Sequence, residues 1–280
     1  MGFASTPGTF RPILGFALLL GALQLQEFAL GQEPPPASGP VFIAHLLDGK
    51  TVSGRLAGLA MDGTLNFVPM EGKAMQIPPT QLHKLKRESI PESSEGEGAF
   101  ICFPEGDRLF RVSIGSAVDN ALDVSTNLFG KVKVPLDSIL GLVLAPPADR
   151  GAFEQWWDRI RTEPRASEVV WMSNGDRRAC GFLGLDDKMV KVQVDTKPIE
   201  IDRKGVTAIG FDPNLVNYPR PTTPYLEFSM TDGSRLGMTE SQLDRGQLTG
   251  LGRFGQRIQF PLNEVVSVYA RSNAMDYLSE

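Results

Sequence analysis

The side chains best suited to chemistry in this sequence are two histidines, two cysteines and a few aspartates that stand beside glycines. His45 and His83 are the only histidines. A zinc site needs three or four ligands, and the sequence offers no third one for them. Asp48, Asp62 and Asp232 lack the alternating acidic ladder that supplies the oxygens of a calcium loop. We therefore expect surface histidines, aspartates that bond their own turn backbone, and no metal site.

Cys102 and Cys180 are the only cysteines. In an oxidising compartment they can form a disulfide, which by loop entropy would stabilise the fold by about 4 kcal/mol. Their apolar-rich surroundings are instead typical of buried free thiols, so both alternatives stay open. The sequence contains no GxSxG, HExxH or P-loop motif. We expect no catalytic residue and no cofactor, and so a protein that is not an enzyme.

Four segments share one pattern, in which an Asp, Asn or Glu stands next to a Gly between two strand-like runs, and we interpret each as a hairpin. The segments are LLDGKTVSGRL (46–56), FPEGDRLFRVSI (103–114), MSNGDRRACGFL (172–183) and SMTDGSRLGMTE (229–240). A second landmark follows each, in MQIPPTQLHKLK, VKVPLDSILGLVL, IEIDRKGVTAIGF and IQFPLNEVVSVYA. From the turn glycine to the proline position the distances are 29, 29, 27 and 28 residues. Such regularity predicts four repeated units.

Each unit is expected to hold about five short antiparallel strands. The composition favours this, because 29 Gly and 21 Pro punctuate a chain that is 41% hydrophobic. Alternation assigns the faces of several strands. The residues expected to point inward are Val132 and Val134; Val190, Val192 and Val194; Phe110, Val112 and Ile114; Ile258 and Phe260. Gly54, Gly181 and Gly237 follow their hairpins and are candidates for a bulge or a tight bend that lets a small sheet curl, and a curled antiparallel sheet closes into a barrel.

The predicted fold is thus all-β, with four tandem small antiparallel barrel units and one inserted helix. The expected organisation is 1–31 signal peptide, 32–40 Pro-rich linker, 41–87 β unit 1, 88–98 acidic linker, 99–145 β unit 2, 148–163 helix, 167–211 β unit 3, 212–224 Pro-rich linker and 225–271 β unit 4. The turn-to-turn spacings of 57, 69 and 58 residues suggest a pair of units duplicated as a pair. Units this small bury little core alone, so two lobes of two units each are expected.

The inserted helix has an apolar stripe, with Asp149 as its cap and Pro164 as its stop. Such a stripe is typical of a helix that packs on a core, and an aromatic platform for a ligand is the alternative. The stripe consists of Phe153, Trp156, Trp157 and Ile160.

The first 31 residues have the pattern of an export signal. Arg11 precedes the apolar run 13–23, and Ala29-Leu30-Gly31 is a small-x-small cleavage pattern. A retained membrane anchor is the alternative, although the run is short for a span. We expect a periplasmic or extracellular protein that meets a membrane only through an uncleaved signal segment. Its net charge of -5 argues against nucleic acid as a partner.

The segment LLDGKTVSGRLAGLAMDGTLNFV (46–68) resembles the first signature of Sm-like proteins, whose fold is a small SH3-like barrel. Asp62 and Asn66 match positions that contact RNA in that family. The Arg-Gly turn of the second signature is replaced by IPPTQL (77–82), and the other units lack the Asn. The resemblance therefore implies barrel topology and not the RNA ligand. The stretch around EVVWMSNGDRRACGFL also resembles repeat modules in exported proteins of planctomycetes.

These observations favour an exported, non-catalytic scaffold or protein-interaction repeat protein, whose partner is an unknown protein or cell-envelope component. A carbohydrate or cell-wall binding module is the alternative, with Trp171, Tyr218, Tyr225 and Tyr269 as candidate stacking residues. An Sm-like nucleic-acid binder is less favoured. A hydrolase comes last, because it would need two carboxylates facing each other in one pocket.

Overall fold

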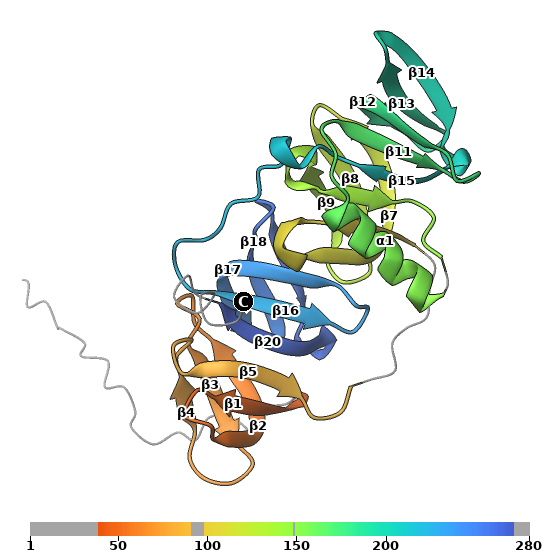
Figure 1. Cartoon of the computed structure of the whole chain (residues 1–280). Coiled ribbons are helices and arrows are strands. Elements are labelled where there is room, and N and C mark those ends of the chain that lie inside the picture. Colours follow the sequence, from red (N-terminus) through yellow and green to blue (C-terminus); the bar gives the residue numbers. More distant parts are fainter. Residues whose placement is uncertain (1–38, 91–97, 148, 272–280) are drawn as a thin grey trace, which may run out of the picture. The chain divides into compact units, whose positions relative to one another are not determined.

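The computed structural model describes residues 39–90, 98–147 and 149–271, which belong to one compact unit. The predicted signal peptide, residues 32–38 of the first linker and residues 91–97 of the acidic linker lie outside the described residues. Antiparallel strands dominate the described part, so the all-β class is confirmed (Figure 1). They form one compact unit rather than the two lobes expected.

The strands fall into four consecutive sets of five. The first set is β1 (Val41–Leu46), β2 (Thr51–Leu59), β3 (Leu65–Pro69), β4 (Met75–Ile77) and β5 (Leu82–Arg87). The second set is β6 (Ala99–Cys102), β7 (Arg108–Val118), β8 (Ala121–Thr126), β9 (Gly130–Pro135) and β10 (Gly141–Val143). The third set is β11 (Glu168–Met172), β12 (Arg177–Leu185), β13 (Met189–Val194), β14 (Lys197–Asp202) and β15 (Val206–Gly210). The fourth set is β16 (Tyr225–Met230), β17 (Arg235–Asp244), β18 (Gln247–Gly252), β19 (Arg257–Pro261) and β20 (Val265–Arg271).

Helical segments are short in the described residues. The α-helix α1 (Arg150–Thr162) lies between the second and third sets. The 3-10 turns are Pro104–Gly106, Leu136–Ser138, Arg203–Gly205, Pro213–Leu215 and Leu262–Glu264. Three of them, Leu136–Ser138, Arg203–Gly205 and Leu262–Glu264, begin one residue after the proline landmark and lie between it and a fifth strand.

Strand pairing follows one order in all four sets. The fourth strand pairs with the third, the third with the second, the second with the first, and the first with the fifth. Among the described residues no fourth strand pairs with the fifth strand of its own set, so the sheet is not closed. The sequence left open whether the units are closed barrels or share strands; the described sets are not closed, because the free edge of each fifth strand pairs with a different set.

This pairing between sets joins fifth strands to each other. Strand β5 pairs with β20, centred on Leu85 and Val268, and β10 pairs with β15, centred on Leu142 and Ile209. All four central residues stand seven positions after the proline landmark of their set. The first set is thus joined to the fourth and the second to the third, rather than as a duplicated pair. Each contact uses the same position on both partners, as in a two-fold symmetric dimer.

The second strand of each set carries an irregularity that bends it. The register against the third strand shifts between Leu56 and Gly58, Ile114 and Ala117, Phe182 and Gly184, and Thr239 and Gln242. These shifts lie downstream of Gly54, Gly181 and Gly237, so the predicted position of the bulges is wrong. Gly54 serves a close approach instead, since a Cβ there would lie 2.4 Å from the carbonyl oxygen of Val68.

The predicted alternation is confirmed in β9, β13 and β19, where the valines, Ile258 and Phe260 face inward and the polar residues face outward. It fails in β7. Arg111 has a positive φ of 51°, and the residues on either side of it point to opposite faces. Val112 and Ile114 are buried in the main core, whereas Phe110 stacks on Phe100 on the face that α1 covers.

Helix α1 packs on the seam between β10 and β15. Asp149 accepts a hydrogen bond from the Ala152 backbone N–H at 2.8 Å, which confirms the predicted cap. Trp157 and Ile160 are buried, and Phe153 and Trp156 pack against the same cluster, so the stripe belongs to a core. The helix approaches the β10–β15 pairing closely because Gly141 has no side chain at that point. A Cβ on Gly141 would lie 2.8 Å from the Ile160 side chain.

Candidate functional site

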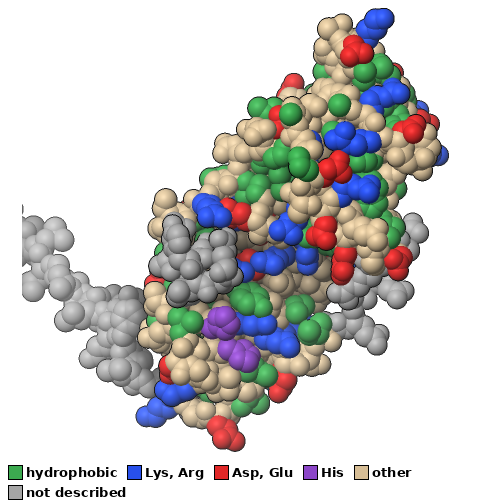
Figure 2. All heavy atoms as spheres, in the orientation of Figure 1, with side chains coloured by type: hydrophobic (Ala, Val, Ile, Leu, Met, Phe, Trp, Pro, Cys, Tyr) green, Lys and Arg blue, Asp and Glu red, His purple; other side chains and the backbone are tan. Residues whose placement is uncertain are grey.

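The outer face of the β5–β20 pairing gathers cationic and aromatic side chains. Leu85 and Val268 point into the core, so their neighbours on each strand point outward. Strand β1 extends this face, because His45 lies opposite Lys84. Figure 2 shows the two histidines next to each other, with Lys and Arg side chains beside them. We call this surface the seam face; it consists of His45, His83, Lys84, Lys86, Tyr269 and Arg271.

The two lysines of the seam face lack a carboxylate partner among the described residues, whereas Arg271 has one. The acid opposite Tyr269 on strand β16 is Glu227, which is 4% exposed. It already pairs with Arg235 at 2.6 Å and with Arg271 at 3.2 Å. Lys84 and Lys86 have no carboxylate partner among the residues that the structure describes. The chain as a whole carries a net charge of -5, so the positive charge of this face is opposite in sign to that of the whole chain.

Tyr269 contacts two of the cations of the seam face, Lys84 and Arg271. The Nζ of Lys84 lies 5.0 Å from the centre of the Tyr269 ring, and the Cζ of Arg271 lies 5.4 Å from it. His83 meets the same ring edge-on at 6.5 Å. Cation–π contacts of this kind orient the charges without neutralising them. The ring is consequently engaged by its own neighbours and not offered to a sugar.

The corresponding face of the β10–β15 pairing has the opposite character. Where the β5–β20 pairing has Lys84, Lys86, Ser267 and Tyr269, the β10–β15 pairing has Gly141, Val143, Ala208 and Gly210. Helix α1 covers these small and apolar residues. In the described part of the chain no helix lies over the seam face. Two faces made by the same strand pairing therefore differ in whether the chain itself covers them.

No protein-family model matches this chain, and no curated protein matches it.

A second polar cluster lies buried where the second and fourth sets meet. Asp107 is 1% exposed and accepts hydrogen bonds from the Tyr218 hydroxyl at 2.6 Å and the Gly237 N–H at 2.9 Å. The guanidinium of Arg253 stacks over the Tyr218 ring at 4.5 Å and pairs with Glu105 at 2.8 Å. Burial raises the pKa of Asp107 to about 6 despite these hydrogen bonds. This cluster joins the two sets, with Asp107 and Arg253 buried and Glu105 partly exposed.

The four aromatic residues proposed for sugar stacking are not brought together. Trp171 lies in the cluster under α1, edge-on to Trp156, and Tyr218 belongs to the main core. Their burial excludes stacking on a glycan. Tyr225 is half-buried beneath Arg253 at 5.4 Å, and Tyr269 is the half-buried ring of the seam face.

The cysteines are both buried and both free. Burial raises the pKa of the Cys102 thiol well above its usual value, and burial together with the charge of Glu168 raises that of Cys180 to about 11. Neither thiol is therefore poised as a nucleophile at neutral pH.

The aspartates beside turn glycines act as turn residues. Asp48, Asp62 and Asp232 each accept a hydrogen bond from the backbone N–H two residues on. Asn66, the match to the Sm-like signature, is exposed on β3 and lies opposite Gly58.

In the described residues no three His, Cys, Asp or Glu side chains are grouped as metal ligands. None of the helices described there is long and apolar enough to cross a membrane.

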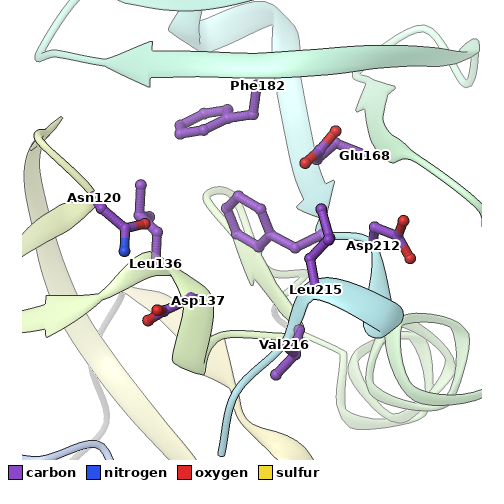
Figure 3. A pocket seen from close by; sticks show the side chains of 9 residues that line it. Asn120, Leu136, Asp137, Glu168, Phe182, Asp212, Leu215 and Val216 are labelled. Atoms are coloured by element: carbon purple, nitrogen blue, oxygen red, sulfur yellow. The ribbon is translucent and has the colours of Figure 1, made fainter.

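A pocket of about 170 Å³ opens between the second and third sets (Figure 3). Its walls are largely apolar, with Leu136, Phe182, Phe211, Leu215 and Val216, and Asn120, Asp137, Glu168 and Asp212 complete them. In Figure 3 the Glu168 carboxylate points toward the space beside Phe182, whereas the carboxylates of Asp137 and Asp212 point away. The pocket therefore presents one inward acid rather than a facing pair.

Sequence reasoning missed Lys84, Lys86 and Glu168. The lysines belong to the alternating segment HKLKR of β5, which is plain in the sequence. Whether they form a cationic surface, however, depends on which strand β5 pairs with. Glu168 had a clearer signal. Counted from the turn glycine, it stands where the other sets have Phe42, Ala99 and Leu226, all buried.

Proposed function

We propose that this chain is an exported, non-catalytic interaction protein whose seam face binds an acidic segment of a partner polypeptide. In this proposal the four sets derive from tandem Sm-like/SH3-like units. The shared strand order and the shared position of the second-strand bulge support that origin. Export is supported by the signal-like pattern of the first 31 residues.

The observation that carries the proposal is the contrast between the two seams. One seam is apolar and takes a helix of the chain itself, while the other is cationic and holds two lysines without a carboxylate partner in the described residues. Lysines that lack a carboxylate partner in the described residues favour an anionic partner, because charge guides the association and an ordered sheet loses little conformational freedom on binding. The role of α1 on the other seam favours a polypeptide as the occupant.

An anionic glycan is the second candidate, since the cations alone do not distinguish it from an acidic peptide. The candidate stacking residues disfavour a glycan, because Trp171 and Tyr218 are buried and the Tyr269 ring already contacts Lys84 and Arg271. A nucleic acid is disfavoured by the net charge of -5.

The test measures binding of a fluorescent poly-L-glutamate peptide to the exported chain by anisotropy. Polygalacturonate and a single-stranded RNA are measured in parallel. We expect the peptide to bind, and the double variant Lys84→Glu/Lys86→Glu to weaken binding at least tenfold, because each repelled contact costs about 1 kcal/mol or more. The matched control is Lys188→Glu/Lys197→Glu, which makes the same change in net charge at two exposed lysines far along the sequence.

The proposal fails if the peptide does not bind, or if the control variant weakens binding as much as the seam variant. Binding of polygalacturonate alone would replace the proposal with the carbohydrate-binding alternative. Binding of RNA alone, lost on Asn66→Ala, would replace it with the Sm-like one.

A further inference from the structure

Glu168 occupies a position that the other sets reserve for the core. It is the first residue of β11 and lies opposite Cys180 in the register with β12. The residues at the same distance from the turn glycine in the other sets are Phe42, Ala99 and Leu226, and none of them is more than 6% exposed. An acid at such a position is costly unless it has a partner.

No such partner exists in the described residues. Glu168 is half-buried, and its side chain makes neither a hydrogen bond nor an ion pair with the described residues. Its charge nevertheless acts inward, because it contributes to raising the pKa of the Cys180 thiol. Figure 3 shows its carboxylate directed toward the pocket, next to Phe182.

Two aromatic rings complete the surroundings of this carboxylate. Phe182 and Phe211 meet edge-to-face, with ring centres 5.3 Å apart and planes at 86°. Both line the pocket. An aromatic cage for a cation has aromatic rings as walls and a carboxylate as counter-ion. Phe182 and Phe211 can serve as two such walls, and Glu168 as the counter-ion.

We propose that this pocket binds an alkylated ammonium group, such as the trimethylammonium of choline or of a methylated lysine. A cation balances Glu168, and alkyl groups on the nitrogen contact Phe182, Phe211, Leu136 and Leu215. A primary ammonium fits less well, because it brings three N–H donors to a pocket with one inward carboxylate. The volume of about 170 Å³ is below the roughly 300 Å³ of pockets for drug-sized ligands, which restricts the occupant to a small head group.

The experiment titrates the whole chain with choline by isothermal calorimetry and repeats the titration with 3,3-dimethylbutan-1-ol, its neutral isostere. We expect choline to bind and the isostere to bind at least tenfold more weakly, since only choline carries the charge. Glu168→Gln keeps the shape of the side chain and is expected to weaken choline binding about tenfold, in the range of a desolvated cation–π and ion contact. Phe182→Leu is expected to do the same. The control is Glu71→Gln, at an exposed acid of the first set, which should leave binding unchanged.

The proposal is overturned if choline does not bind, if the isostere binds as well as choline, or if Glu168→Gln binds choline as the wild type does. Thermal melting of each variant checks that it is folded, and the isostere comparison uses the wild type and needs no variant. Two further arms use phosphatidylcholine vesicles and a peptide with one trimethyllysine. Binding of either one supports the proposal and identifies the source of the head group. This inference does not depend on the seam face, and failure of one leaves the other standing.

Discussion

At the scale of single residues, this protein places charge where its own pattern predicts none. Lys84 and Tyr269 stand at positions that are Gly141 and Gly210 in the other seam, and Glu168 stands where other sets have buried apolar residues. The ammonium group of Lys84 and the carboxylate of Glu168 do not contribute to the packing of a core. At both places the same chain holds a small or apolar residue at the equivalent position, so the fold itself does not require the charge.

Asp107 gives a prediction about pH. Its pKa is raised by burial to about 6 in the folded chain, against about 3.9 when unfolded. The folded chain therefore keeps a proton that the unfolded chain has lost between these values. The stability that neutral Asp107 contributes is fully present below about pH 4 and is lost as the pH rises through 6, with a difference on the order of 3 kcal/mol.

The check is urea unfolding of the wild type and Asp107→Asn between pH 4 and pH 7. We expect the free energy of unfolding of the wild type to fall relative to that of the variant as the pH rises. Asn cannot ionise, and all other titrating groups are shared by the two proteins. Parallel curves would show that Asp107 does not titrate in this range.

At the scale of elements, close approach of α1 to the β10–β15 seam requires Gly141. An added Cβ would lie 2.8 Å from the Ile160 side chain and 2.8 Å from the backbone oxygen of Ile209. Gly141→Ala is thus expected to lower the free energy of unfolding by about 1–3 kcal/mol, as overpacking does. Gly181→Ala is the matched control, because the nearest atom to its Cβ would be the Cβ of Gln193 at 3.8 Å. Chemical denaturation compares the two, and an equal cost would contradict the close packing of α1.

The elements were largely predictable from local chemistry. Asp or Asn beside Gly fixed the hairpins, and alternation fixed the faces of β9, β13 and β19. The helix followed from its apolar stripe and Asp149. The alternation fails in β7 because Arg111 has a positive φ of 51°. Arginine is not a residue type from which a positive φ is expected. The bulges likewise lie outside the glycines that the sequence suggested, since Glu240 supplies a positive φ in β17 without glycine.

At the scale of the whole molecule, the sets associate by edge pairing of their fifth strands. The sequence spacing identified the units but not their partners, because all fifth strands carry a buried apolar residue at the central position. The buried apolar character of this residue does not distinguish one fifth strand from another. The four central residues are Leu85, Leu142, Ile209 and Val268. Only the side chains on the opposite face, cationic on one seam and small on the other, distinguish the two pairs. The seam face could not be assembled from the sequence, since it needs β5 and β20 side by side.

The pairing predicts how destabilisation spreads. Val268 is 1% exposed and lies opposite Leu85, so Val268→Ala should leave a cavity that loosens β20 and β5 together. Native-state hydrogen exchange should then quicken in Leu82–Arg87 and Val265–Arg271, and remain unchanged in Val206–Gly210. Leu142→Ala should have the reverse effect, on β10 and β15. Exchange that quickens in β10 or β15 after Val268→Ala would contradict the assignment of partners.

The central claim, that the seam face binds acidic polypeptide, is tested most directly by zero-length carbodiimide cross-linking to poly-L-glutamate followed by peptide mass spectrometry. Cross-links form only where a lysine amine touches a glutamate carboxylate. We predict that they concentrate on Lys84 and Lys86 and that Lys188 and Lys197, which are also exposed, remain nearly unlabelled. An even distribution over the exposed lysines, or a concentration away from β5, would contradict the claim.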